Sequence, residues 1–517
     1  MKIQFIWPNF DCPIGISCGV AYLSGALRSA GHETRIIHIC EALDFPYDPE
    51  RIEREIRDFG PGLIAISAGA NHYPEMCQIG QRLRASLNVP VVFGGVHTTL
   101  NTAMVMKDNP WLDFANFGEG EESLRDLARA LEDGLDTTGI PNVWGRRDGQ
   151  IIHNPARPLR DLTTLPWMDL DGWQFERVTR MRRGWVNVYM NRGCPYRCTY
   201  CHNNGIAKVL QREFDTKTSS NHDIGYLRMR GIDDMLAELK NIKARYPFVS
   251  AFSFNDDTFT MDQDHMKKFL VRYKAEINVP YVCNTTVIDV DREMLEIMKD
   301  SGCDLVRFGV ETATGRIKKQ VLKRDFSNEK TEFVFRTCNE IGLRCLAFNM
   351  IANPTETPEE MLDTMRLNAR LRPSAIRVSL GYPYVGTEYY DISKQLNLVE
   401  EDKVFHNYSQ QSRLKWSEPE RLWIDKLRTF YWWWLNVYLE NEASPLYANL
   451  WKLVEAIPGQ EWHEPDATKH LFDIESSVSF LLKKQNVTHY HVPFSDRPDI
   501  SILHCARPVE RETLDEH

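Results

Sequence analysis

The stretch Asn191-Arg192-Gly193-Cys194-Pro195-Tyr196-Arg197-Cys198-Thr199-Tyr200-Cys201 contains three cysteines in the spacing CxxxCxxC. An iron-sulfur cluster that only carries electrons is normally closed by four cysteines. A structural zinc ion takes four Cys or His ligands, usually from two CxxC-like pairs. Three thiolates in this spacing instead favour a [4Fe-4S] cluster that is bound through three irons, so that the fourth iron stays open for chemistry. A zinc site or a fortuitous match is the alternative, because short motifs give false positives.

The Gly-Cys-Pro-Tyr start of this motif and the aromatic Tyr200 before its last cysteine resemble the radical S-adenosylmethionine (radical SAM) superfamily. The resemblance implies that Cys194, Cys198 and Cys201 bind the cluster. It also implies that the open iron chelates the amino and carboxylate groups of SAM, and that Tyr200 is one of the SAM contacts.

Composition indicates a large enzyme with more than one hydrophobic core. The 517 residues are too many for a single core and suggest about three domains. Hydrophobic residues make up 43% of the chain, and its 13 Trp and 24 Phe can fill such cores. The net charge of -10 argues against binding to nucleic acid and favours a small-molecule or protein substrate.

Cysteine usage indicates a reducing, cytoplasmic environment. Three of the 12 cysteines form the motif and the others are scattered, which is not the pattern of a disulfide framework. Cys283 and Cys345 lie in apolar surroundings that are typical of a core. The apolar start at residues 1–8 is too short for a signal peptide, and no apolar run approaches the roughly 20 residues that span a bilayer. The sequence therefore predicts a cytoplasmic protein without a transmembrane segment.

Strand and helix patterns alternate over residues 1–147, which is typical of a parallel sheet with helices on both faces. The sequence therefore predicts an α/β fold that begins with a doubly wound, Rossmann-like domain. Ligands of such sheets bind beyond the carboxyl ends of the strands. The expected elements are strands at 2–7, 33–39, 63–67 and 89–93, and helices at 19–30, 48–59 and 74–87.

Small or glycine-rich turns follow these strands, and glycine lets the backbone approach a large planar ligand. Alone, such turns fit any doubly wound domain. Their order, after Pro13-x-Gly15 and Gly31-His32-Glu33, resembles the cobalamin-binding domain of B12-dependent radical SAM enzymes. The cobalamin-binding residues that this resemblance implies are Ser67, Ala68, Gly94, Gly95, Val96, His97, Thr98, Gly118 and Glu119.

The sequence lacks the Asp-x-His-x-x-Gly motif of the methionine-synthase type of B12 domain. The resemblance therefore implies base-off cobalamin, with either no protein ligand below cobalt or one from another residue. Asn71 and His72 follow the strand that ends at residue 67 and are candidates for that position. A surface or helix-capping role is the alternative for both.

A polar, proline-bearing segment at residues 148–184 predicts a linker that lies extended along the surface. From residue 185 onward strands and helices alternate again, and the cysteine motif follows the first strand, at the end where barrel enzymes have their active sites. Six strands fit the partial (β/α)6 barrel of radical SAM enzymes over residues 185–392. The expected strands are 185–190, 251–255, 281–285, 305–310, 346–351 and 376–380, and the expected helices are 233–246, 264–277, 292–301, 328–341 and 358–371.

Acidic residues at two of these strand ends resemble SAM contacts of the family. Asp256 and Asp257 resemble a turn near the SAM ammonium group, and surface charge is the alternative. Glu311 resembles the acid of the family's Gly-x-Glu, whose carboxylate is suited to accept hydrogen bonds from ribose hydroxyls. The segment 353–357 differs from the family's Gly-x-Pro-Gly-Glu-Thr at both glycines, so a different local turn is expected there.

Residues 393–517 are expected to form a mostly helical C-terminal domain. Aromatic residues recur near helical spacing over residues 418–440. An aromatic stripe of this kind usually belongs to a core. The alternative is a domain that caps the barrel mouth over the substrate.

The resemblance covers roughly residues 1–390 and implies a cobalamin-dependent radical SAM C-methyltransferase. In that family a 5'-deoxyadenosyl radical abstracts hydrogen from an unactivated carbon, and methylcobalamin supplies the methyl group. The implied substrate is a metabolite or natural-product precursor, and the implied electron donor is an external flavodoxin or ferredoxin. Two alternatives remain open. One is a non-methylating enzyme that catalyses a rearrangement or an oxidative cyclisation, and the other is a cobalamin-binding iron-sulfur electron-transfer protein.

Overall fold

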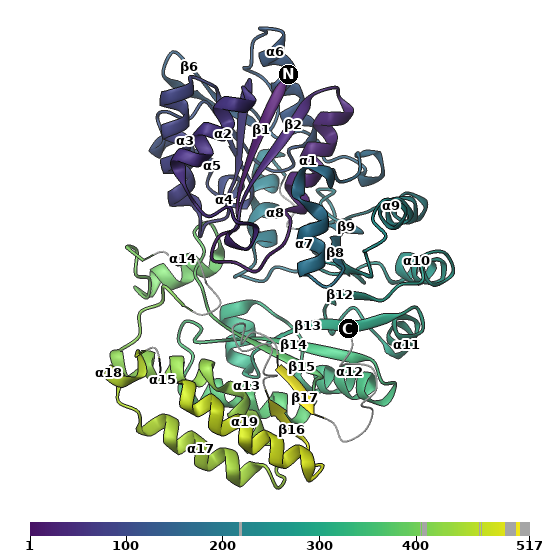
Figure 1. Ribbon diagram of the computed structural model, residues 1–517, viewed down its shortest axis with the longest axis vertical. Helices are drawn as coiled ribbons and strands as arrows, with labels where there is room; N and C mark the ends of the chain where they lie inside the picture. Colours follow the sequence, from purple (N-terminus) through teal and green to yellow (C-terminus); the bar gives the residue numbers. More distant parts are fainter. Residues whose placement is uncertain are drawn as a thin grey trace. The chain divides into compact units, whose positions relative to one another are not determined.

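The computed structural model describes residues 1–216, 220–403, 405, 411–464, 466, 468–491 and 503–506 (Figure 1). Its contacts group the chain into two compact units. Unit 1 contains Met1–Asp257 and Tyr384–Asp391, and unit 2 contains Thr258–Pro383, Ile392–Lys403 and the described residues from 411 onward. The four domain ranges expected from the sequence stay a prediction.

Unit 1 begins with a seven-stranded sheet in the order β2-β1-β3-β4-β5-β6-β7. The first five strands in this order are parallel, and β6 and β7 are added antiparallel. This parallel sheet confirms the predicted α/β fold of the N-terminal region. The strands are β1 (Lys2–Pro8), β2 (Glu33–Ile39), β3 (Leu63–Ser67), β4 (Val91–Gly94), β5 (Phe114–Asn116), β6 (Val143–Arg147) and β7 (Gln150–Ile152).

The helices of this sheet begin and end where the local sequence provides caps. The Ser17 side chain accepts a hydrogen bond from the Val20 amide at the start of the first helix, and Asp48 caps the second in the same way. The core between sheet and helices is aliphatic, with Ile6 and Ile64 from strands packed with Ile52. The helices are α1 (Cys18–Ser29), α2 (Pro49–Phe59), α3 (Tyr73–Leu87), α4 (Val96–Leu100), α5 (Thr102–Asp108) and α6 (Glu121–Glu132), with the short η1 (Glu41–Leu43).

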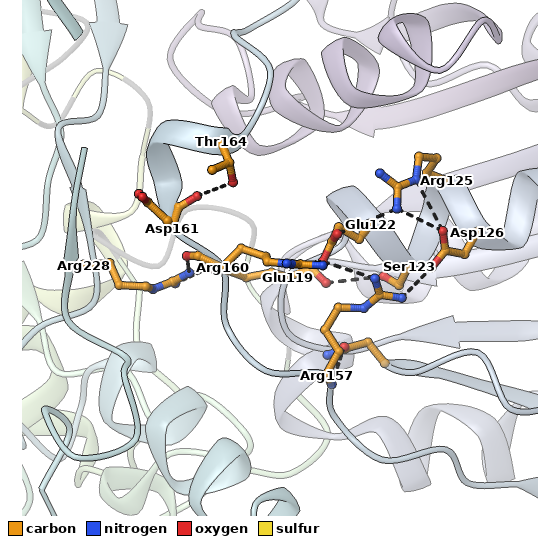
Figure 2. Close-up of polar contacts among 11 residues, drawn as sticks. Glu119, Glu122, Ser123, Arg125, Asp126, Arg157, Arg160, Asp161, Thr164 and Arg228 are labelled. Atoms are coloured by element: carbon orange, nitrogen blue, oxygen red, sulfur yellow. Dashed lines mark hydrogen bonds and ion pairs between the residues drawn. The ribbon is translucent and has the colours of Figure 1, made fainter. Parts of the chain in front are cut away.

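The segment expected to be a surface linker is partly buried. Trp173 is almost fully buried, and its ring packs against those of Trp7 and His38. Figure 2 shows how Arg157 and Arg160 of this segment meet Glu122 of α6. The prediction that this segment lies extended along the surface is therefore wrong. Its prolines suggested exposure, but apolar side chains such as Trp173 are buried against the sheet. Its short elements are η2 (Leu162–Thr164), η3 (Asp171–Trp173) and α7 (Phe175–Met181).

The rest of unit 1 surrounds the cysteine motif. Strands β8 (Trp185–Val188) and β11 (Ala251–Phe254) pair in parallel. The two-residue strands β9 (Asn191–Arg192) and β10 (Arg228–Met229) pair antiparallel. Helix α8 (His202–Glu213) begins directly after the last cysteine, and α9 (Ile232–Arg245) leads toward β11.

Unit 2 contains the other four predicted barrel strands, in the parallel order β12-β13-β14-β15. Two strands from the end of the chain extend this sheet, because β17 pairs antiparallel with β15 and β16 with β17. The strands are β12 (Tyr281–Thr285), β13 (Cys303–Glu311), β14 (Arg344–Ile351), β15 (Ala375–Leu380), β16 (His489–His491) and β17 (Leu503–Ala506). The helices between them are α10 (Gln263–Glu276), α11 (Arg292–Asp300), η4 (Ile317–Leu322), α12 (Asn328–Glu340) and α13 (Pro358–Leu371).

The C-terminal region is largely helical, as predicted (Figure 1). The periodic segment 418–440 forms two helices and not one, because the chain leaves helical geometry at Phe430. Trp432 and Trp433 are fully buried, and the Phe430 ring lies 4.4 Å from that of Trp433. These aromatic residues are therefore core. The helices are α14 (Glu388–Gln395), α15 (Glu418–Thr429), α16 (Tyr431–Val437), α17 (Ser444–Ala456), α18 (Gly459–Trp462) and α19 (Lys469–Lys484).

In the described part of the chain, no helix has the length and the apolar character that crossing a membrane requires.

Trp433→Ala is expected to lower the free energy of unfolding of the C-terminal helices by about 3 to 5 kcal/mol, because it opens a cavity in a packed aromatic core. Phe480→Ala is the matched control, since the Phe480 side chain on α19 is 57% exposed, and a surface change of this kind shifts stability by about 0.5 kcal/mol or less. Chemical denaturation followed by tryptophan fluorescence measures both. Equal effects of the two substitutions would contradict the core assignment.

Candidate active site

Unit 1 contains a cavity of about 370 Å³ at the carboxyl ends of its parallel strands. Ser67, Gly94 and Asn116, which end β3, β4 and β5, lie in its wall. Other wall residues belong to the segments around the cysteine motif, and these are Tyr189, Asn191, Arg192, Gly193, Asn203, Ile206, Leu210, Tyr226 and Asp257. The cavity therefore borders both the glycine-rich turns and the loop that carries the cysteines.

Most residues predicted to bind cobalamin line this cavity. They are Ser67, Gly94, Gly95, Val96, Gly118 and Glu119. Ala68, His97 and Thr98 are buried beside it and do not belong to its wall. Tyr22, Thr99, Asn116 and Glu121 also line it and were not among the predicted cobalamin contacts, although Thr99 and Glu121 belong to the glycine-rich turns at 94–99 and 118–121.

Backbone geometry at the turn after β4 leaves room for a ligand. Gly95 has φ of +92°, and a Cβ atom on it would lie 3.1 Å from Ser67 Oγ and 3.2 Å from the Ala68 carbonyl oxygen. Glycine is therefore required there. At Gly94 the nearest atom to an added Cβ is the Asn116 carbonyl oxygen at 4.0 Å, so only the absence of a side chain keeps this part of the wall flat. These turns fit a large planar group such as cobalamin.

Two histidines lie close to this turn. His97 is buried, its ring centroid lies 4.2 Å from that of Tyr73, and burial, with a smaller effect of His202, lowers its pKa to about 4. It is therefore neutral at neutral pH. His72 is also buried, and its Nε2 lies 2.9 Å from the Phe10 carbonyl oxygen. His72 occupies the N-cap position of α3, although its side chain makes no capping hydrogen bond, and the surface role considered for it is wrong because the residue is buried.

Two cysteines of the motif are buried, and the third, Cys201, is half-buried. Cys194 and Cys198 are 9% and 7% exposed. Cys201 is the N-cap of α8, where the helix dipole favours a thiolate. Burial first, and then Asp257 and the other two thiols, raise the pKa of Cys201 to about 12. Iron binds cysteine as the thiolate, so a bound cluster would offset this penalty, and the residue types are those that the predicted group takes as ligands.

The loop that carries the cysteines is fixed through its backbone. The Asn221 side-chain amide donates to the Cys194 carbonyl oxygen at 2.8 Å. Gly193 has φ of +90°, and a Cβ atom on it would lie 2.3 Å from the Tyr226 carbonyl oxygen. The segment that ends at β10 therefore packs directly against the loop. No sequence motif indicated this contact.

The two adjacent acids after β11 have different surroundings. Asp256 is fully buried and accepts hydrogen bonds from the Met190 and Asn191 amides at 2.8 and 2.5 Å. Burial raises its pKa to about 7, although these bonds act to lower it. Asp257 lines the cavity. The carboxylate of Asp256 thus ties β11 to the start of the cysteine loop, and Asp257 is the acid that faces the cavity.

Two further residues predicted to contact SAM, Tyr200 and Glu311, do not line this cavity. Tyr200 is half-buried in unit 1, outside the cavity wall. Glu311 ends β13 in unit 2 with φ of +65°, a conformation that costs a non-glycine residue energy and is often found at functional sites. Its Oε1 lies 4.0 Å from Arg324 Nη1, and Arg324 also donates to the Gly309 carbonyl oxygen at 2.7 Å.

A network of four charges joins the glycine-rich turn before α6 to the cysteine loop. Arg192, two residues before Cys194, lies 3.2 Å from Glu119 and 2.5 Å from Glu121. Arg228 on β10 binds the same Glu119 with both terminal nitrogens. Burial alone would raise the pKa of Glu119, but Arg192 and Arg228 hold it below its ordinary value. Glu119 from the glycine-rich turn and Arg192 from the cysteine loop both line the cavity.

Comparison with known proteins agrees with this geometry. Residues 13–128 match the B12 binding domain, and residues 188–367 match the Radical SAM superfamily. The uncharacterized methyltransferase PH0819 of Pyrococcus horikoshii is 26% identical over 412 residues, which cover 77% of this chain and 84% of its own. The anaerobic magnesium-protoporphyrin IX monomethyl ester cyclase of Rubrivivax gelatinosus is 23% identical over 406 residues, which cover 74% and 68%.

A solved structure shows the same fold. The radical SAM methyltransferase TsrM of Kitasatospora setae, with cobalamin and a [4Fe-4S] cluster bound, aligns with a TM-score of 0.62 and 19% identity over 77% of this chain and 78% of its own. The two family matches confirm the predicted resemblance, because the chain contains an N-terminal B12-binding domain followed by a radical SAM domain. Its cofactors are cobalamin, SAM and a [4Fe-4S] cluster.

The charge network gives a first prediction for the site. Arg192→Leu is expected to lower the free energy of unfolding by about 3 kcal/mol, because it leaves the largely buried Glu121 without its ion pair. Adding Glu121→Leu should recover part of that loss, since the uncompensated charge is then gone. Chemical denaturation of the cofactor-free protein gives the coupling energy between the two residues.

The exposed pair Arg147–Asp136, at 2.6 Å with side chains 53% and 60% exposed, is the matched control. Its coupling is expected to be about 1 kcal/mol or less. Because the pKa of Glu119 is lowered, the stabilisation from the network should be complete above the ordinary pKa of a glutamate and be lost as the pH falls through the lower pKa that Glu119 has in the folded protein. A network coupling no larger than that of the exposed pair would contradict the assignment.

Gly94→Leu is expected to abolish hydroxocobalamin binding, because the new side chain extends into the cavity without clashing with the protein. Gly315→Leu is the control, since an added Cβ there meets no atom within 4 Å and Gly315 belongs to unit 2 and does not line the cavity. Titration followed by ultraviolet-visible absorbance measures both affinities. Equal affinity of the Gly94 variant and the wild type would place cobalamin elsewhere.

Proposed function

We propose that this enzyme is a C-methyltransferase that methylates an unactivated carbon of a metabolite or natural-product precursor. The observation that supports this most is the single cavity whose wall includes Gly94 and Gly95 of the B12-binding domain together with Asn203 and Asp257 beside the cysteine motif. Two groups that react in sequence at one carbon have to be held close together. Similarity to methyltransferases from Pyrococcus horikoshii and Kitasatospora setae also supports it.

In this proposal the chain's own residues bind and orient the cofactors. Cys194, Cys198 and Cys201 bind the cluster, and the glycine turns after β4 and β5 leave a flat wall for cobalamin. When bound, the cluster and SAM supply hydrogen abstraction from carbon, and cobalamin supplies the methyl transfer. Asp257 accepts hydrogen bonds at the cavity wall and Glu311 accepts them from the ribose of SAM.

The surroundings of Glu311 suit this role. Its backbone has a positive φ, and Arg324 lies 4.0 Å from one of its carboxylate oxygens, so the side chain has a fixed position next to a cation. A carboxylate held in this way loses little freedom when it binds a ribose. An external flavodoxin or ferredoxin supplies the electron, and the protein works in the cytoplasm, as its cysteine usage predicts.

One other function has support from a specific observation. The Rubrivivax gelatinosus relative, which covers 74% of this chain, is named as a cyclase. A B12-dependent radical SAM enzyme that forms a ring without methylation is therefore the second candidate. The two functions use the same cofactors, so only the fate of the SAM methyl group separates them.

A substrate-independent experiment tests the proposal. The full chain is reconstituted anaerobically with iron, sulfide and hydroxocobalamin, and then incubated with reductant and SAM that carries a deuterated methyl group. Methyltransferase function predicts that the label moves to cobalamin with formation of S-adenosylhomocysteine, and that 5'-deoxyadenosine forms as well. Mass spectrometry measures all three products.

Formation of 5'-deoxyadenosine without labelled cobalamin would favour the cyclase. The triple variant Cys194→Ala, Cys198→Ala and Cys201→Ala is the control, because it should lose cluster absorbance and all 5'-deoxyadenosine while still binding cobalamin. Four irons per chain in that variant would disprove the cluster assignment.

A further inference from the structure

Asn203 occupies the first turn of α8, two residues after the last cysteine of the motif. Its side-chain amide nitrogen lies 3.8 Å from Cys201 Sγ, within hydrogen-bond distance for sulfur. Its side-chain oxygen lies 2.6 Å from the Tyr226 hydroxyl oxygen. The same amide also hydrogen-bonds the carboxylate of Asp257 and lowers the pKa that burial raises. One side chain thus contacts a thiol, a carboxyl group and a phenol.

The hydrogen-bonding capacities of these groups fix the direction of every bond. A thiolate and a carboxylate only accept hydrogen bonds. Both therefore bind the two N–H groups of the Asn203 amide, and its oxygen must face Tyr226. The Tyr226 hydroxyl then donates to that oxygen, which leaves the amide no freedom to flip.

The tyrosine is held independently of this contact. Tyr226 is 6% exposed, and its backbone nitrogen donates to the Asn221 carbonyl oxygen at 3.1 Å. Its own carbonyl oxygen packs against Gly193 of the cysteine loop. Asn203, Tyr226 and Asp257 all line the cavity. The bonded groups therefore lie where the cluster loop meets the proposed cobalamin site.

We infer that Asn203 and Tyr226 are positioning residues of the proposed methyltransferase site. Tyr226 orients the Asn203 amide, and the amide binds the Cys201 thiolate and holds the Asp257 carboxylate at the cavity wall. Its N–H bond to sulfur also stabilises the more negative, reduced form of the cluster, because hydrogen bonds to cluster sulfurs set the reduction potential. This inference rests on the cofactors of the proposed function.

The test uses the full chain reconstituted with the cluster, in the variants Asn203→Asp and Tyr226→Phe. Asn203→Asp keeps the shape of the side chain, removes both N–H donors and adds a negative charge beside Cys201 and Asp257. We expect it to lower the midpoint potential of the cluster, measured by redox titration followed by electron paramagnetic resonance. Tyr226→Phe should shift the potential in the same direction by less, since the amide remains but loses its anchor.

Tyr246→Phe is the matched control. Tyr246 donates to Asp171 at 2.6 Å, the same distance as the bond from Tyr226 to Asn203, and it does not line the cavity. We expect this variant to keep the wild-type potential, and a comparable loss of melting temperature in both tyrosine variants would show that stability alone does not move the potential. A second readout is hydroxocobalamin affinity, which should fall several-fold in Asn203→Asp only.

Wild-type potentials in both variants, at full cluster loading, would overturn the inference and leave the proposed function intact. A wild-type chain that takes up no cluster would overturn both. If Asn203→Asp does not fold, the potential of Tyr226→Phe relative to Tyr246→Phe decides the question by itself.

Discussion

The candidate site depends on the ion pairs between Glu119, Glu121, Arg192 and Arg228. The two acids follow β5 of the B12-binding domain, and the two arginines flank the cysteine motif, so the network joins segments that lie far apart in the sequence. Charges that are largely removed from water are costly unless each is paired. Loss of one partner therefore disturbs the other three. This requirement fixes the glycine-rich turn and the cysteine loop against each other along one cavity.

The cysteine loop shows why positioning around a metal group needs more than its ligands. Asp256 ties β11 to the loop through two backbone amides, and Asn221 holds the carbonyl of Cys194. Burial first, and then Asp257 and the neighbouring thiols, raise the pKa of Cys201, so its thiolate is costly unless iron binds it. The backbone contacts with Asp256 and Asn221 fix the course of the loop that carries the cysteines.

Sequence patterns predicted the regular elements well. Strands β2, β3 and β12 and helix α13 have the predicted bounds, because a buried parallel strand reads as a continuous apolar run and capping residues mark the ends of a helix. The short strands β5 and β7 were not predicted, because three residues are too few to show the alternation of a strand. The helix break at Phe430 was not predicted either, because the aromatic residues recur at helical spacing on both sides of it. The burial of Trp173 also escaped prediction, because prolines around it suggested exposure.

The sequence by itself determined the chemistry of this protein. The CxxxCxxC motif and the ordered glycine turns predict three cofactors, and each of these patterns is formed by residues that are close together along the chain. Only the tertiary structure decided which groups meet. Tyr226 and Asn203 are separated by 22 other residues, and Glu119 and Arg192 come from different parts of unit 1. Each of these side chains is common and carries no local signal. Their roles arise from distance and burial, which set the strength of a hydrogen bond or an ion pair and which no short pattern encodes.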